Sequence, residues 1–242
     1  MSEWLAFQLY GAMASWGDIA VGEFRSSWDH PTRSAVIGLL CAALGIRRDE
    51  EERLRAVAAG YRFSFRINEE GTPVRDYHTT QVPASGSGRN RRVFLTRKEE
   101  LSVSEDQIST ILSTRDYLCD SGYTIFVSPL PDAPYSLQVL RDHLRNPVFT
   151  LYLGRKSCPL SHPLNPQVIE ARSLDEACRI VPPVLVSGRK KERFRVFWEA
   201  GVEAGMKEFQ RQIRRDEPTS RRRWQFSGRE EYSGTVQVSV VG

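Results

Sequence analysis

The stretch Trp4-Leu5-Ala6-Phe7-Gln8-Leu9-Tyr10 decides the class of the fold. Its positions 5, 7 and 9 carry large apolar side chains, and positions 6 and 8 carry a small and a polar one. Alternation with a period of two is typical of a β-strand with one face against a core. The chain is therefore predicted to begin with a strand, which a loop from Gly11 to Gly17 follows.

A helix and a second strand are predicted next. Residues 36–44 form an apolar run, which follows Pro31 and Thr32 and ends at Gly45. Proline and threonine favour the start of a helix, and glycine favours its end. A second helix is predicted over residues 49–59, because its first turn is acidic. From residue 61 to 67, aromatic and apolar side chains occupy every other position, which predicts a second strand.

The same patterns recur in residues 123–153. Residues 123–127 are rich in β-formers, residues 135–144 place leucines at helical spacing, and residues 147–153 alternate again. Without the extra helix at 49–59, the order is strand, helix, strand, strand, helix, strand. This order is that of the ferredoxin-like plan of RRM-type RNA-recognition domains. We therefore expect an α+β fold that contains a ferredoxin-like (RRM-type) domain.

Two regions depart from this order. Residues from about 72 to 117 are long, polar and basic, and such an insertion within a compact domain is usually functional or disordered. Residues 199–215 carry a helical stripe, but Gly201 and Gly205 disfavour a helix, so we favour a strand, a turn and a returning strand. The chain is thus divided into a domain of residues 1–153 and a smaller β-rich C-terminal region of residues 154–242.

Basic residues are clustered rather than spread. The formal net charge is +4, and between residues 189 and 231 there are 13 Lys or Arg against 8 Asp or Glu. Another cluster, Arg89, Arg91, Arg92, Arg97 and Lys98, lies within the polar insertion. Clustered arginine is typical of a phosphate-binding surface, although a solvated face that keeps the protein soluble would look the same.

Cysteine and histidine give no sign of a metal site. The four cysteines form no CxxC pair, and His30 and His162 each precede a proline without metal-ligand spacing. The N-terminus lacks the features of a signal peptide, and no apolar stretch is long enough to span a membrane. We expect a cytoplasmic protein with reduced thiols that needs no metal or other cofactor.

Asp76-Tyr77-His78 admits two interpretations. His78 beside Tyr77 could serve acid–base cleavage of RNA. Alternatively, His78 stacks on a base or satisfies a backbone contact, and we favour this because no second His or Lys lies nearby in the sequence.

Three further features suggest contacts with nucleic acid, each with a structural alternative. Arg33 and Ser34 at a helix start could seat a phosphate, or Thr32 could simply cap the helix. Gly154-Arg155-Lys156-Ser157 is interpreted as a turn that presents Arg155 and Lys156, not as a P-loop. Aromatic side chains beside basic ones, at Trp16 and in Arg221-Arg222-Arg223-Trp224, could stack on bases, fill a core or protect a strand edge.

Several segments together resemble the Cas-five family of CRISPR proteins, in its type I-E branch. They are residues 9–17 (Leu-Tyr-Gly-Ala-Met-Ala-Ser-Trp-Gly), 31–34 (Pro-Thr-Arg-Ser), 44–49, 75–79 (Arg-Asp-Tyr-His-Thr), 115–120 and 152–164. They occur in the family's order, and the last is specific to the type I-E branch. The C-terminal third matches more loosely, chiefly at Arg215-Asp216-Glu217-Pro218.

This resemblance implies an RRM-like fold with an inserted thumb, which we place at about residues 74–117. It implies a subunit that binds the 5′ handle of the CRISPR RNA (crRNA) and caps the backbone filament of a Cascade complex. The backbone subunits (CasC), the large subunit (CasA) and target DNA within the complex are the implied partners. Relatives in another subtype cut precursor RNA themselves, whereas the type I-E branch does not, so we expect no enzyme; a metal-independent endoribonuclease is the alternative.

On charge and motif position, we predict the following residues to bind RNA: Trp16, Arg33, Ser34, Arg75, His78, Arg89, Arg91, Arg92, Arg115, Arg155 and Lys156.

Overall fold

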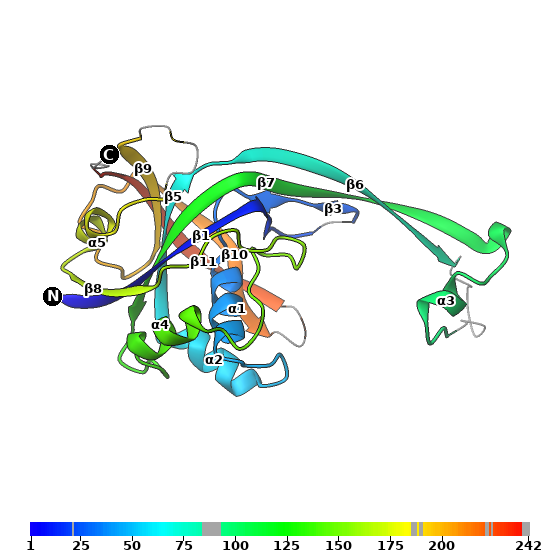
Figure 1. Ribbon diagram of the computed structural model, residues 1–242, viewed down its shortest axis with the longest axis horizontal. Helices are drawn as coiled ribbons and strands as arrows, with labels where there is room; N and C mark the ends of the chain where they lie inside the picture. Colours follow the sequence, from blue (N-terminus) through cyan, green and yellow to red (C-terminus); the bar gives the residue numbers. More distant parts are fainter. Residues whose placement is uncertain are drawn as a thin grey trace.

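The computed structural model describes residues 1–20, 22–83, 93–184, 188, 191–220, 223 and 225–238. One large, mostly antiparallel sheet forms the body of the molecule, and a long two-stranded arm projects from it (Figure 1). Among the described residues, no helix has the length and the apolar character needed to cross a bilayer.

Four strands make up the centre of the sheet. They are β1 (Ser2–Ala14), β5 (Tyr61–Glu69), β7 (Ile108–Pro129) and β8 (Gln167–Ala171), and they lie in the order β5-β7-β1-β8. Each neighbouring pair is antiparallel. Because β1 alternates as predicted, its odd-numbered and even-numbered side chains enter different cores.

Helices cover both faces of this sheet. Three helices, α1 (Arg33–Ala43), α2 (Glu51–Gly60) and α4 (Leu137–Arg145), bury their apolar sides in one core with Leu5, Phe7 and Leu9. A single helix, α5 (Leu174–Ile180), packs on the other face with Trp4 and Ala6. The helices predicted at 49–59 and 135–144 are thus confirmed within a few residues at each end.

The strand predicted at residues 147–153 is wrong. The fourth central strand is β8, and the predicted segment instead lies against the C-terminal end of α1. The backbone N–H groups of Val148 and Phe149 donate to the carbonyls of Ala43 and Ala42, at 3.0 and 3.1 Å. The last carbonyls of a helix have no partner inside the helix. They therefore accept the N–H hydrogen bonds of this segment, which a neighbouring strand would otherwise accept.

The C-terminal strands extend the same sheet. They are β9 (Arg193–Glu199), β10 (Gln210–Ser220) and β11 (Gln225–Gln237), and they continue it beyond β5 in the order β9-β11-β10. No helix forms over the stripe at 199–215, where Gly201 and Gly205 both have positive φ angles. The returning strand β10 pairs with β11 rather than with β9.

The arm consists of β6 (Thr72–Pro83) and residues 108–119 of β7, which pair along their whole length. The short helices α3 (Arg97–Glu100) and η1 (Glu105–Gln107) lie near its tip, far from the body (Figure 1). At the base of the arm, the two-residue strand β3 (Phe24–Arg25) pairs with the free edge of β7. A separate small sheet joins β2 (Trp16–Gly17) to β4 (Ser27–Trp28).

Candidate nucleic-acid interface

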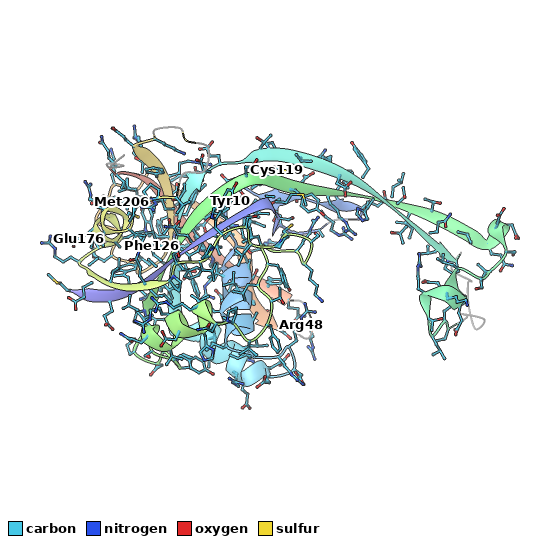
Figure 2. The ribbon with its side chains drawn as sticks, in the orientation of Figure 1. Tyr10, Arg48, Cys119, Phe126, Glu176 and Met206 are labelled. Carbon is cyan, nitrogen blue, oxygen red and sulfur yellow. The ribbon has the colours of Figure 1, made fainter. Side chains whose placement is uncertain are left out.

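A cleft of about 1000 Å³ opens between α1, residues 149–159 and the C-terminal hairpin of β10 and β11. Its floor is apolar and contains the buried apolar side chains of Leu39, Cys41, Ile46 and Leu151. Its lining also includes four exposed basic residues, Arg47, Arg48, Lys156 and Arg215. Figure 2 labels Arg48, which lies at the periphery of the body, to the right of α1. An apolar floor beside several cations can take bases and phosphates together.

The electrostatic balance of the cleft is positive. The cations share the lining with two carboxylates, Asp18 and Asp216. Asp216 is already compensated, because Arg229 donates to both of its oxygens at 2.7 and 2.9 Å. A concave surface with excess positive charge concentrates anions such as phosphate groups.

The start of α1 is closed to an external phosphate. Thr32 is the N-cap, and its hydroxyl accepts from the Ala35 N–H at 3.2 Å. The Arg33 N–H donates to the carboxylate of Asp216 at 2.7 Å. The prediction of a phosphate seat at this N–H is therefore wrong, because a carboxylate of the chain itself occupies the positive end of the helix dipole. Ser34 lines the cleft, and its role in binding RNA stays a prediction.

The predicted RNA contact of Arg33 is also wrong. Its side chain is 8% exposed and points into the protein. The guanidinium pairs with Glu199 at 2.9 Å and Glu217 at 2.8 Å, and it donates to the carbonyl of Ala58 at 2.6 Å. Burial raises the pKa of Glu199 to about 7, against the opposing charges of Arg33 and Arg229. Arg33 therefore joins α1 to the C-terminal strands.

Trp16 is a core residue, so its predicted role in base stacking is wrong. It is 1% exposed and makes an edge contact with Tyr123, with ring centroids 5.5 Å apart. The Gly-bounded loop belongs to the body of the protein, because β2 and β4 pair Trp16 with Trp28.

A turn follows residue 153 as predicted, but of its two basic side chains Lys156 is exposed whereas Arg155 is half-buried. Gly154 has a φ of +83°, and a Cβ atom there would lie 1.8 Å from the carbonyl oxygen of Ser15, so only glycine fits. Lys156 is exposed and lines the cleft. The guanidinium of Arg155 lies over the ring of Tyr117, 4.8 Å from its centroid. That contact connects the wall of the cleft to the base of the arm.

Arg75 lies on the arm and is engaged in an ion pair across the two strands. It donates to both oxygens of Asp116, at 2.7 and 3.1 Å. This hydrogen-bonded pair lowers the pKa of Asp116 and raises that of Arg75. Both side chains remain partly exposed, so Arg75 can still meet a ligand on this face.

Tyr77 and His78 project from opposite faces of the arm. They are consecutive residues of β6, and successive side chains of a strand alternate. His78 lies 2.8 Å from Asp76 on its own face, whereas Tyr77 is opposite Thr114. One reacting phosphate could not contact both side chains, so this geometry gives no support to an endoribonuclease that uses the pair.

One further predicted residue, Arg115, lies on the arm. Arg115 is half-buried and opposite Asp76, on the face that also carries His78 and Tyr117. Arg89, Arg91 and Arg92 lie outside the described residues. The face with Arg115 and His78 thus adjoins Arg155 and the cleft, whereas Arg75 lies on the other face.

Sequence reasoning missed Arg47, Arg48 and Arg215 as cleft residues. All three lie within segments that carry the family resemblance, at residues 44–49 and 215–218. Membership of those segments was the available signal, but only the fold brings them together beside Lys156. Within the described part of the chain, no three His, Cys, Asp or Glu side chains gather in a group that could hold a metal ion.

Comparison with protein families and curated sequences gives consistent matches. The family model described as "CRISPR-associated protein (Cas_Cas5)", the Cas-five family, matches residues 4–231. The CRISPR system Cascade subunit CasD of Escherichia coli (strain K12) is 34% identical over 172 residues, which cover 68% of this chain and 70% of that protein.

Solved structures share the fold. A chain of a structure described as "CRISPR RNA-guided surveillance complex" aligns with a TM-score of 0.68 and 24% identity, over 99% of this chain and 94% of that one. A second, described as "Crystal structure of Cas protein", gives 0.65 and 24%, over 97% and 95%. These alignments show a common α+β, strand-rich architecture.

Proposed function

The chain belongs to the Cas-five family of CRISPR-associated proteins, and from this premise we propose that it is a non-catalytic RNA-binding subunit of a type I-E Cascade complex. It binds the 5′ handle of the crRNA and caps the backbone filament, in antiviral defence in the cytoplasm. The observation that carries this proposal is the cleft, in which an apolar floor adjoins four exposed cations.

The shape of the cleft suits unpaired RNA better than a duplex. Sequence-specific RNA recognition mostly targets single strands, whose unstacked bases contact apolar and aromatic side chains while basic side chains hold the phosphates. Phe149, which lines the cleft and is 39% exposed, offers the first kind of contact above the apolar floor, and Arg47, Arg48 and Lys156 offer the second.

The core corresponds to a modified ferredoxin-like plan of the RRM type. The elements β1, α1, β5, β7, α4 and β8 follow in strand-helix-strand-strand-helix-strand order. In space their strands lie in the order fourth, first, third, second, which supports this plan. The arm is then the thumb inserted between the second and third strands of the plan, and β9 to β11 form the added C-terminal part.

The proposed partners follow from the Cascade relative. The relative CasD is described as a Cascade subunit. For this chain, the proposed protein contacts are the backbone subunits (CasC) and the large subunit (CasA), with target DNA held in the same complex. The arm extends far from the body, so it can reach a neighbouring subunit or the guide beyond the cleft (Figure 1).

A binding experiment with charge-neutralising variants tests the proposal. Lys156→Ala and Arg48→Ala should each weaken binding of the full chain to a labelled handle RNA and leave the fold intact, because both residues are exposed. Arg172→Ala is the matched control, since this exposed arginine lies beside α5 and pairs with Glu176. Equal affinity of all three variants would refute binding in the cleft.

A cleavage assay separates the subunit from the endoribonuclease alternative. The purified chain is incubated with labelled repeat RNA, and we expect the RNA to stay whole. Specific cleavage that disappears in His78→Ala would overturn the non-catalytic assignment.

A further inference from the structure

Two aromatic side chains at the base of the arm are exposed to solvent. Tyr77 on β6 is 71% exposed, and Phe24 on β3 is 63% exposed. Large aromatic side chains are mostly buried in folded proteins, so two exposed rings near one another require an explanation.

The strand register places both rings on one face. Tyr77 is opposite Thr114 of β7, and Phe24 is opposite the same Thr114 on the other edge of that strand. Paired residues of neighbouring strands point to the same side of a sheet. Tyr77, Thr114 and Phe24 thus form one row, whose outer members are two strand spacings or about 10 Å apart.

The row is fixed to the cleft by backbone hydrogen bonds. The carbonyl of Glu23 accepts from the Thr114 N–H at 3.0 Å. The guanidinium of Arg155 donates to the carbonyl of Arg25 at 3.3 Å. The loop that leads into β3 also lines the cleft at Gly17, Asp18 and Ile19. The row lies on the face of the arm opposite Arg155, so RNA that leaves the cleft over this loop crosses the edge of β3 to reach Phe24.

The surroundings of the two rings are polar. Thr114 separates them, and the Arg75–Asp116 ion pair and Thr79 flank Tyr77 on the same face. Protein–protein contacts use contiguous apolar patches. The bases of single-stranded nucleic acid instead stack on isolated aromatic rings of a sheet that are separated by polar groups. Leu112, which is opposite Thr79, is the one nearby aliphatic exposed on this face of the described arm.

We propose that Tyr77 and Phe24 form a stacking platform on which successive bases of single-stranded RNA lie after they leave the cleft. This inference rests on the proposed function. It assigns base stacking to Tyr77 and Phe24 in place of Trp16. The platform reads no sequence, because every base has a face that can stack on an aromatic ring.

Fluorescence of a base analogue tests the platform directly. The probe is an oligouridine of about 12 nucleotides, within the range that one single-strand-binding module covers, with 2-aminopurine at successive positions. Bound to the full chain, 2-aminopurine at two neighbouring sites should be quenched. Tyr77→Leu and Phe24→Leu should each abolish quenching at one of these sites and weaken binding about 5-fold or more, whereas Tyr77→Phe and Leu112→Ala should change neither.

The possible outcomes are distinct. Unchanged quenching in both leucine variants, with an unchanged urea midpoint, would overturn the platform. If Leu112→Ala lowers affinity as much as they do, the face is an apolar protein-docking surface and the proposal also fails. A separate experiment tests the handle assignment by comparing how well handle RNA and a scrambled RNA displace the labelled oligouridine. Equal displacement by the two RNAs would refute the handle assignment but not the stacking platform.

Discussion

Arg33 offers a sharp test of the distinction between a buried ion pair and an RNA contact. Arg33→Met keeps much of the aliphatic volume but removes the guanidinium. Glu199, whose side chain is 8% exposed, then loses its partner at 2.9 Å, and the carbonyls of Ala58 and Tyr61 lose a donor. Breaking a buried pair by removing one partner costs about 3–5 kcal/mol. We expect a loss of stability of that size and no direct loss of affinity.

Urea unfolding of three variants measures this effect. Arg33→Met should shift the midpoint strongly to lower urea. The double variant Arg33→Met/Glu199→Met should recover part of the loss, because it leaves no unpaired charge at the Glu199 position. Arg172→Met is the control, because the exposed pair of Arg172 with Glu176 contributes at most about 1 kcal/mol.

The opposite pattern would refute the reasoning. If Arg33→Met unfolds at the wild-type urea concentration while its affinity for handle RNA drops, then Arg33 reaches the ligand and the buried network is not its function. A double variant less stable than Arg33→Met would equally contradict the assigned pairing with Glu199.

Further predictions concern Glu199, Gly154 and Lys156. Because burial raises the pKa of Glu199 from 4.5 to about 7, its stabilising contribution is present below pH 4.5 and is lost as the pH rises through 7. The side chain in Glu199→Gln cannot ionise. As the pH rises from 4.5 to above 7, the free energy of unfolding of this variant should therefore increase by about 3 kcal/mol relative to that of the wild type, as measured by urea unfolding. Equal pH dependence of the two proteins would contradict this. Gly154→Ala should cost about 1–3 kcal/mol in thermal unfolding and weaken RNA binding, since its Cβ would meet the Ser15 carbonyl at 1.8 Å. Affinity for handle RNA should fall about tenfold or more from low to moderate salt, with the logarithmic slope reduced by about 0.7 in Lys156→Ala; a flat response in the wild type would count against phosphate contacts.

The sequence by itself determined the elements whose signal is local. Alternation in residues 4–10 and 61–67 predicted β1 and β5, since a period of two is a property of the strand alone. Thr32 marked the N-cap of α1, because capping needs only its own hydroxyl and an N–H three residues on. The turn at Gly154 was predicted because the segment lacks the upstream glycine and the following helix of a P-loop, and glycine adopts the positive φ found there.

Tertiary structure alone decided which residues face solvent and which lie together. Trp16 and Arg33 occur in segments that suggested RNA contacts. In the fold, however, Trp16 is buried against Tyr123, and Arg33 pairs with Glu199 of a strand far along the chain. Residues 147–153 alternate like a strand, but they bond to the end of α1, so β8 takes the fourth place in the sheet. Burial and pairing depend on residues distant in sequence, and local pattern carries no information about those partners.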